Sequence, residues 1–419
     1  MMFNILLFVA GILIYSYFGL VGTAVLAALT AVNWLGGLLT ARKPKTAAVF
    51  IAFDALVLAF AKFFLPLGGI VQPLGFSYYT FQFISYIADV KSGKAEAERN
   101  FITFAFVSTY IPKMFFGPIE KYTEYRGKLL AKHKITLDSF NKGVLRIMWG
   151  LFKKLVIAGR VGQVVSYVVG KDLGGAYVLA ALIAYSVQLY SDFSGGIDIV
   201  CGVSSIWGVS LSENFDRPYF SQSVREFWRR WHITLGAWLR DYIYIPLGGS
   251  RKGKIRKIIN TLVTFLVSGL WHGTAYILWG FFHGIGVCFG DKFKTKCRAL
   301  NIFGTYVCVT LLWAFFVWPT GFGIEAAKKL FSLVTVFNYG EFFSSLPAFG
   351  ISFADFTVMC VSVAVLWIAD LRIDGIRAFF EKKQSYAALA CGALLGLAVL
   401  VFGVYGIGFE VSGFIYGRL

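Results

Sequence analysis

Long apolar segments separated by short charged connections dominate the chain. Runs such as Thr46 to Leu65, Tyr177 to Trp207 and Tyr386 to Tyr405 are long enough to cross a bilayer as helices. Helices satisfy their own backbone hydrogen bonds, and hydrocarbon leaves few other ways to span it. The pattern therefore predicts an all-α, polytopic membrane protein with about ten or eleven transmembrane helices plus interfacial and re-entrant helices.

One stretch, residues 222–290, differs from this pattern by carrying ionisable groups inside apolar sequence. The chain has 4 histidines, and His232, His272 and His283 all lie in this stretch. An ionisable side chain at membrane depth is costly to place, so it indicates a functional site. We interpret residues 222–290 as the catalytic core of a single membrane-embedded domain that covers residues 1–419.

The first part of the core stretch is amphipathic if residues 223–242 are placed on one helix. At about 100° per residue, the large apolar side chains fall on one arc. They are Trp228, Trp231, Leu235, Trp238, Leu239 and Tyr242. This predicts a helix in the membrane interface with His232 at the edge of its apolar face. A histidine that points into a cavity and one bound to backbone or lipid phosphate fit the pattern equally well.

The second part, residues 260–290, is too long and too rich in glycine for one plain span. We expect a break near Gly269–Gly273, which places His272 where the backbone turns. A neutral histidine there is a candidate general base, because its ordinary pKa is close to 7. Spacing alone supports a satisfied core histidine equally well. His272 and His283 are eleven apart and no third ligand falls at a helical spacing, so we predict no metal.

Two carboxylates interrupt the apolar run 177–207. Asp192 and Asp198 are six residues apart among serines and glycines. A proton relay or cation site and simple polar packing against neighbouring helices are equally compatible with this pattern.

Composition and charge narrow the class of protein. The chain is 58% hydrophobic and 15% charged, well below the charge of soluble domains, and its net charge is +18. The basic residues cluster in short connections, as expected on the cytoplasmic side, so membrane lipid and not nucleic acid is the expected partner. Between residues 225 and 257 the basic side chains are Arg225, Arg229, Arg230, Arg240, Arg251, Lys252, Lys254, Arg256 and Lys257, against Glu226 and Asp241. This patch, and Arg229 and Arg230 in particular, also suits an anionic acyl donor.

Four runs in the core stretch resemble motifs of the membrane-bound O-acyltransferase family. They are Phe227–His232 (FWRRWH), Asp241–Gly249 (DYIYIPLGG), Leu270–Gly273 (LWHG) and Trp279–Gly284 (WGFFHG). Pro73–Gln82, Gly117–Ile119 and Asn214–Tyr219 match the same family in order. The chain looks most like the branch with the alginate O-acetylation membrane protein, and the D-alanyl transfer protein of teichoic acid is a nearby relative.

The resemblance implies a ring of tilted helices around a funnel or tunnel. The position of His272 is that of the family's catalytic histidine, and His232 matches its second active-site residue. We assign His283, Trp271, Asn214, Asp241 and Trp231 to supporting the site or lining the tunnel.

The resemblance also implies the reaction and its partners. A cytoplasmic donor such as acetyl-CoA or an acyl-carrier thioester supplies the acyl group, with no tightly bound cofactor. The acyl group crosses the cytoplasmic membrane, and an extracytoplasmic partner of the SGNH-hydrolase type completes its transfer to an exported or cell-wall polysaccharide. The run Tyr244–Gly249 favours acetyl over D-alanyl, because the D-alanyl branch usually lacks it.

Two other classes of function remain as alternatives. A proton-coupled transporter could use the membrane histidines and acids as a relay, and a non-catalytic membrane scaffold would need none of them. Neither alternative gives a reason to combine the motif that ends at His232 with the motif around His272.

Overall fold

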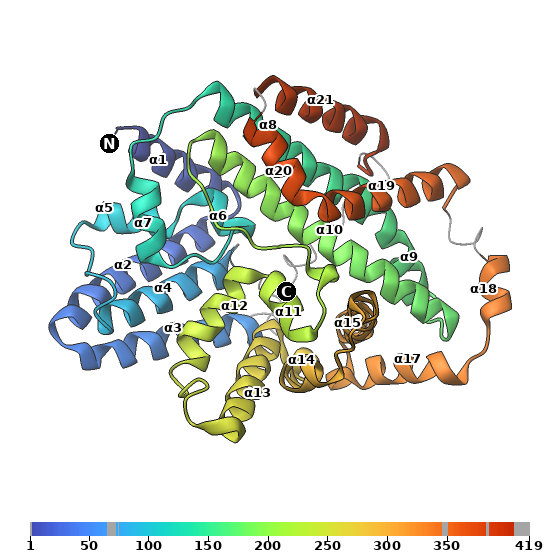
Figure 1. Cartoon of the computed structure of the whole chain (residues 1–419). Coiled ribbons are helices and arrows are strands. Elements are labelled where there is room, and N and C mark those ends of the chain that lie inside the picture. The colour runs from blue at the N-terminus through green and yellow to red at the C-terminus, as the bar shows by residue number, and fades with distance from the viewer. Residues whose placement is uncertain (1, 65–72, 74, 346–350, 383–384, 406–419) are drawn as a thin grey trace. The chain divides into compact units, whose positions relative to one another are not determined.

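Figure 1 shows the computed structural model, which describes residues 2–64, 73, 75–345, 351–382 and 385–405. In these ranges every regular element is a helix, apart from one isolated antiparallel bridge between Phe215 and Trp231. The predicted all-α class is confirmed. Leu65, the last residue of the predicted run from Thr46, and Leu74, within the motif Pro73–Gln82, lie outside the described residues.

The chain forms two compact units, Met1–Phe140 with Val203–Ser212, and Asn141–Gly202 with Glu213–Leu419. The first contains α1 (Met2–Tyr17), α2 (Leu20–Arg42), α3 (Ala47–Phe63), α4 (Phe76–Lys91), α5 (Phe101–Ser108), α6 (Ile111–Phe116) and α7 (Tyr122–Leu130). The single catalytic domain stays a prediction.

The second unit holds the whole core stretch. Its longer helices are α8 (Leu137–Leu151, which begins in the first unit), α9 (Gly159–Gly170), α10 (Ala176–Ile206, which ends in the first unit), α13 (Gly253–His272), α14 (Ile277–Phe289), α15 (Arg298–Leu312), α17 (Ile324–Thr335), α19 (Phe353–Leu371), α20 (Ile373–Lys382) and α21 (Ser385–Phe402). Its shorter ones are α11 (Val224–Arg230), α12 (Ile233–Leu239), α16 (Ala314–Val317) and α18 (Tyr339–Ser345). π-helical turns η3 (Phe152–Ala158) and η5 (Arg240–Tyr244) extend α8 and α12.

Several of these helices can cross a membrane. Five segments are long and apolar enough, namely Leu20–Arg42, Pro44–Phe63, Ala176–Ile206, Arg298–Val317 and Phe353–Leu371. Leu7–Tyr17 and Tyr386–Phe402 are shorter apolar helices. The multi-pass membrane prediction is confirmed, and the number of ten or eleven spans stays a prediction.

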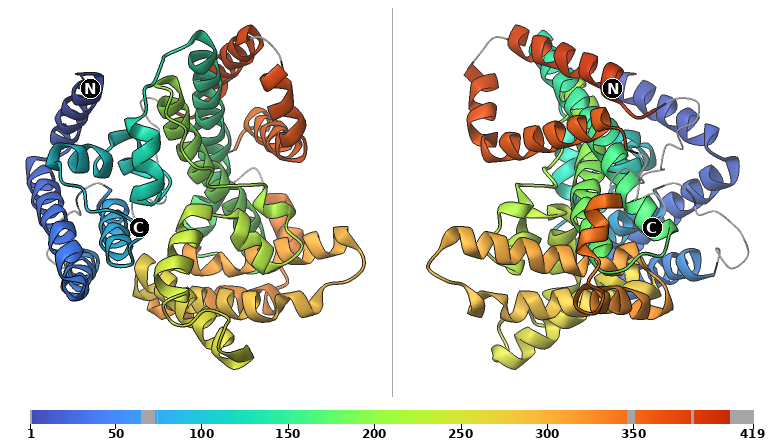
Figure 2. Two further views of the ribbon diagram at one scale, coloured as in Figure 1. Left: turned by 60° about the vertical axis from the view of Figure 1, so that its left-hand side comes forward. Right: turned by 90° about the vertical axis from the view of Figure 1, so that its right-hand side faces the viewer.

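Glycines allow α8 and α10 to pack unusually closely, and the two helices lie side by side in Figures 1 and 2. A Cβ added to Gly150 would come within 2.5 Å of the Gly195 carbonyl oxygen, and one added to Gly202 within 2.7 Å of the Gly143 oxygen. Close contact through small residues is a common way to pair membrane helices.

The close approach of α10 to α8 and η3 resolves the two interpretations of the α10 carboxylates. Lys154 pairs with Asp192, and Lys153 pairs with Asp198. Both carboxylates therefore pack against cations of a neighbouring segment, which is the polar-packing interpretation.

The predicted break in residues 260–290 is confirmed. Helix α13 ends at His272, and Gly273 takes a backbone φ of 139°, which favours glycine. Helices α13 and α14 then pack as an antiparallel hairpin, seen in Figure 2. A Cβ on Gly280 would lie 2.3 Å from the Phe265 carbonyl oxygen, so only glycine permits this contact.

The prediction of one continuous helix over residues 223–242 is wrong. The chain ends α11 at Arg230, passes through Trp231 and His232, and begins α12 at Ile233. The reason is a tertiary contact: the Asp216 amide donates to the Arg230 oxygen and the Ile233 amide to the Asn214 oxygen, both at 3.0 Å. These bonds, with the Phe215–Trp231 bridge, replace the helical ones at the break.

Candidate active site

His232 occupies the break between α11 and α12 in a left-handed backbone conformation, with φ 47° and ψ 52°. Few residues other than glycine adopt this conformation, although histidine does so more often than most. The side chain is buried, and its ring meets the ring of Phe193 edge-on at 4.8 Å. Backbone strain of this kind gathers at functional sites.

Asn214 holds the imidazole of His232. Its Oδ1 accepts hydrogen bonds from the Thr234 amide at 3.1 Å and the Thr234 hydroxyl at 2.8 Å, and it lies 3.3 Å from His232 Nδ1. The backbone amide can only donate, so the atom it contacts is the amide oxygen of Asn214. His232 Nδ1 must then carry a proton, and the lone pair of the neutral ring lies on Nε2.

His283 is held in the opposite way. The indole Nε1 of Trp228 donates to His283 Nδ1 at 3.1 Å, and the two rings are perpendicular. An indole nitrogen only donates, so Nδ1 of His283 is the acceptor and its proton lies on Nε2. The side chain is fully buried, and its lone pair is already used. This arrangement suits a supporting role.

His272 is enclosed by aromatic rings at the turn after α13. Its ring lies 4.4 Å from that of Trp271, 5.2 Å from Phe316 and 5.4 Å from Trp279. Trp279 also lies 5.0 Å from His283, so one indole separates the two histidines. His272 therefore faces the aromatic interior of the second unit and is only 5% exposed.

A cavity of about 410 Å³ opens beside His232. Three arginines line it: Arg225, Arg229 and Arg240. Arg225 pairs with Asp291 at 2.7 Å and Arg240 with Asp241 at 2.7 Å. No ion-pair partner for Arg229 occurs among the described residues, so its charge is available to a ligand. The lining includes neither His272 nor His283.

Asp291, the partner of Arg225, does not line the cavity and is outside the candidate membrane spans. Burial would raise the pKa of its carboxyl, but hydrogen bonds with Ser223 and Lys294 and the charge of Arg225 hold that pKa below its ordinary value. The Arg225 guanidinium is therefore neutralised at the pH of the cell.

The other predicted site residues have structural contacts. Trp231 is fully buried and stacks on Phe227 at 5.4 Å. Arg230 pairs with Glu226 at 2.6 Å and does not line the cavity. Asp241 is the partner of Arg240 and is also absent from the cavity lining. Trp271 packs on the ring of His272. Their predicted roles stay predictions.

Sequence reasoning did not assign site roles to Trp228 and Trp279. Trp228 orients His283, and Trp279 lies between His272 and His283. Trp279 and His283 are four residues apart on α14, which places them on one helix face, so this spacing was a usable signal. Among the residues described, no group of three or more His, Cys, Asp or Glu side chains could hold a metal ion.

A comparison of the sequence with known families identifies the family of the chain. The family model described as "MBOAT, membrane-bound O-acyltransferase family" matches residues 98–334, more than half of the chain. The chain belongs to this family. All three histidines of the core stretch fall within the matched residues of this O-acyltransferase family member.

Individual relatives carry acetyltransferase names. The "Probable alginate O-acetylase AlgI" of Pseudomonas syringae pv. tomato is 35% identical over 75% of this chain and 60% of its own length. Its namesake in Pseudomonas fluorescens is 33% identical over 91% of this chain and 79% of its own. The "Peptidoglycan O-acetyltransferase" of Helicobacter pylori is 30% identical over 59% of this chain and 54% of its own.

The predicted nearby relative is also found. The "Teichoic acid D-alanyltransferase" of Streptococcus thermophilus is 29% identical over 54% of this chain and 59% of its own length. The resemblance read from the sequence motifs is confirmed at the level of the family and of both relatives.

Proposed function

We propose that this family member is an O-acyltransferase that acetylates a polysaccharide of the cell envelope. The observation that carries the proposal is His232, whose imidazole is oriented by Asn214 and which lines a cavity together with three arginines. Membership of an acyltransferase family supports the reaction type. The printed names of the relatives, which refer to alginate and peptidoglycan, support the acceptor class.

The acyl group is acetyl in this proposal. Relatives named as O-acetylases reach 35% identity and align with up to 92% of the chain, whereas the D-alanyltransferase of Streptococcus thermophilus reaches 29% over 54%. D-alanyl transfer is the second candidate, because that relative shares the same fold family.

The chemistry needs one proton acceptor. As the acceptor hydroxyl oxygen attacks the carbonyl carbon of a thioester, the new C–O bond forms, the C–S bond breaks, and the sulfur leaves as a thiol. A histidine takes the hydroxyl proton and returns a proton to the leaving sulfur, which balances the reaction. We assign the general base to His272 and the second active-site role to His232.

The donor in this proposal is cytoplasmic acetyl-CoA or an acyl-carrier thioester, and Arg229 contacts its phosphates. Guanidinium groups suit phosphate because they offer paired donors in one plane. The protein lies in the cytoplasmic membrane, and an extracytoplasmic partner of the SGNH-hydrolase type completes transfer to the exported polymer.

The test compares two histidine variants in cells that make the acceptor polymer. We expect His272→Gln to lower ester content about 10²–10⁴-fold, the usual contribution of a general base. His133→Gln is the matched control, because His133 is half-buried in the first unit and its hydrogen bond within the described part of the chain is to the Leu129 oxygen. Protein amount in the membrane is measured by quantitative immunoblot.

The outcomes separate the candidates. Full ester content in His272→Gln would rule out the base assignment. Mass spectrometry of the released acyl group distinguishes acetate from D-alanine. A protein that moves a solute without forming any ester, with wild-type flux in His272→Gln, would be a transporter.

A further inference from the structure

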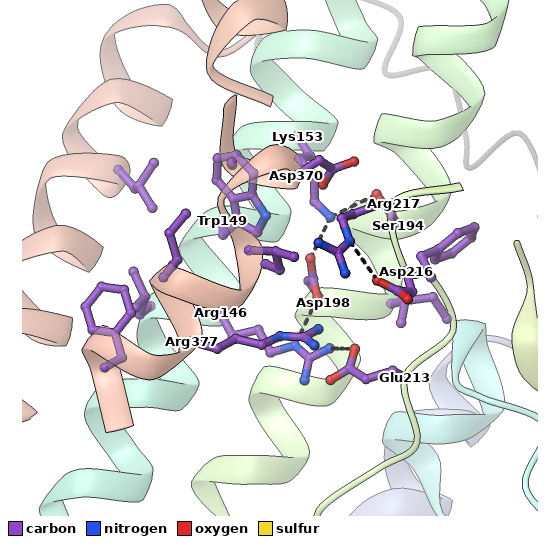
Figure 3. A pocket seen from close by; sticks show the side chains of 18 of the residues that line it. Arg146, Trp149, Lys153, Ser194, Asp198, Glu213, Asp216, Arg217, Asp370 and Arg377 are labelled. Carbon is purple, nitrogen blue, oxygen red and sulfur yellow. Dashed lines mark hydrogen bonds and ion pairs between the residues drawn. The ribbon is translucent and has the colours of Figure 1, made fainter. Parts of the chain in front are cut away.

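A second pocket in the same unit, of about 510 Å³, has no part in the reaction described above. Its walls come from α8, α10, residues 213–217, and the α19–α21 segment, as Figure 3 shows. None of the histidines His232, His272 and His283 lines it. We call it the polar pocket.

The carboxylates of the polar pocket are already engaged. Asp198 binds Arg146 at 2.9 Å and also Lys153, and Glu213 binds Arg146 at 2.6 Å. Asp216 contacts Arg217 at 3.2 Å, and Asp370 accepts a hydrogen bond from the hydroxyl of Tyr190 at 2.8 Å. Each of these four carboxylates therefore already has a cationic or hydroxyl partner in the protein.

The cations outnumber the carboxylates by one. Five line the pocket, namely Lys142, Arg146, Lys153, Arg217 and Arg377, against Asp198, Glu213, Asp216 and Asp370. Arg377 enters from α20, and no carboxylate or hydrogen-bond acceptor contacts its guanidinium among the described residues. In the view of Figure 3 it extends toward the same part of the pocket as Arg146. Asp374 beside the pocket pairs with Arg217 at 2.8 Å and offsets the fifth positive charge, so the feature that favours an anion is the guanidinium of Arg377.

Part of the wall is apolar. Ile376 and Phe380 of α20, Leu395 of α21 and Leu145 of α8 line it. Helix α20 connects α19, a candidate membrane span, with the apolar helix α21. The pocket thus has a charged wall next to a hydrocarbon-like wall, at the end of a membrane span.

We propose that the polar pocket binds an anionic phospholipid, with its phosphate group on Arg377 and Arg146 and an acyl chain along Ile376, Phe380 and Leu395. Basic pockets between membrane helices commonly hold anionic headgroups. A free phosphate ion offers the same charge to the two arginines but nothing to the apolar wall. Residues 372–382 carry three basic side chains against two acidic ones, which favours the cytoplasmic side for α20.

Arg377→Gln tests the proposal, with Arg372→Gln as the matched control. Both arginines are exposed and carry the same charge on the same segment, but only Arg377 lines the pocket. The protein is purified in neutral detergent and titrated with phosphatidylglycerol, phosphatidylcholine or inorganic phosphate. Native mass spectrometry counts bound lipid, and thermal unfolding gives the shift in Tm.

We expect phosphatidylglycerol to bind and to raise the Tm of wild type and Arg372→Gln. In Arg377→Gln its apparent affinity should fall roughly tenfold, as for loss of a charge-assisted contact. Phe380→Ala should weaken lipid binding through the apolar wall without changing the response to phosphate.

Three results would overturn the proposal. An equal loss of affinity for phosphatidylglycerol in both arginine variants would mean that the surface charge as a whole attracts the lipid. An equal Tm rise with inorganic phosphate would mean a free-anion site, and no preference for phosphatidylglycerol over phosphatidylcholine would mean no anionic site. The assay uses no acyl transfer, so its failure is independent of the proposed enzymatic function.

Discussion

His232 and His283 are both buried in the second unit, and yet the structure prepares them for different tasks. Asn214 Oδ1 accepts a hydrogen bond from Nδ1–H of His232 and leaves the lone pair on Nε2, whereas Trp228 donates to Nδ1 of His283 and occupies its lone pair. Burial of a histidine in a membrane protein therefore does not by itself assign its role. The partner of Nδ1 shows whether Nε2 keeps a lone pair for the reaction.

The strongest test of this comparison is His232→Asn against His283→Asn. Asparagine tolerates the left-handed backbone at position 232 but has no group that is basic near pH 7. We expect His232→Asn to lower the rate of ester formation about 10²–10⁴-fold per folded molecule. Rates are measured with purified protein and normalised by size-exclusion chromatography.

His283→Asn should lose stability but keep most of its rate per folded molecule. An equal loss of rate in both variants would contradict the distinction between an active-site histidine at position 232 and a supporting histidine at position 283.

Asn214→Leu should have the next largest effect, because one oxygen serves three donors. Its loss leaves the buried Thr234 amide and hydroxyl and the His232 imidazole without their acceptor, which costs about 1–3 kcal/mol for each unsatisfied group. We expect a lower Tm and a lower rate. Asn214→Asp retains an acceptor oxygen and should preserve more of the Tm, and the reverse order would argue against this geometry.

Gly280→Ala perturbs the His283 region without touching an imidazole. The new methyl group would meet the Phe265 carbonyl oxygen at 2.3 Å, so the α13–α14 hairpin must open. Overpacking of this kind costs about 1–3 kcal/mol. Thermal unfolding in detergent measures it. Gly304→Ala is the control, because an added methyl group there would meet no described atom within 4 Å beyond its own stretch of helix.

Trp228→Phe should have the smallest effect. It removes the donor to His283 but keeps most of the ring packing, a loss of about 0.5–1.5 kcal/mol. The rate per folded molecule should stay within a few-fold of wild type. A decrease as large as that of Asn214→Leu would show that the His283 tautomer matters for the reaction.

The sequence predicted the turn at His272 but not the break at His232, for a physical reason. Gly273 needs a backbone conformation that favours glycine, so the turn carries its own local signal. Residues 230–233 contain neither glycine nor proline, and the break depends on hydrogen bonds from residues 214 and 216. Local periodicity contains no information about such a distant partner.

Local sequence pattern also could not predict the partners of the α10 carboxylates or of Trp228. Whether Asp192 and Asp198 relay protons or pair with lysines depends on which helix lies beside α10, and the Gly143 and Gly150 contacts decide that. The direction of a hydrogen bond between Trp228 and His283, 55 residues apart, likewise requires coordinates.

The segment 213–217 contributes residues both to the polar pocket and to the site around His232. Glu213, Asp216 and Arg217 line the polar pocket. Asn214 contacts the imidazole of His232. Phe215 lines the polar pocket and also packs edge-on against the ring of Phe193. Adjacent residues of this short segment thus contact two different sites. A shift of the backbone that accommodates a change in one site would therefore move the residues that contact the other. Asn214 is fully buried, and in a saturation mutagenesis screen the other four positions should accept fewer replacements than their exposure alone would suggest.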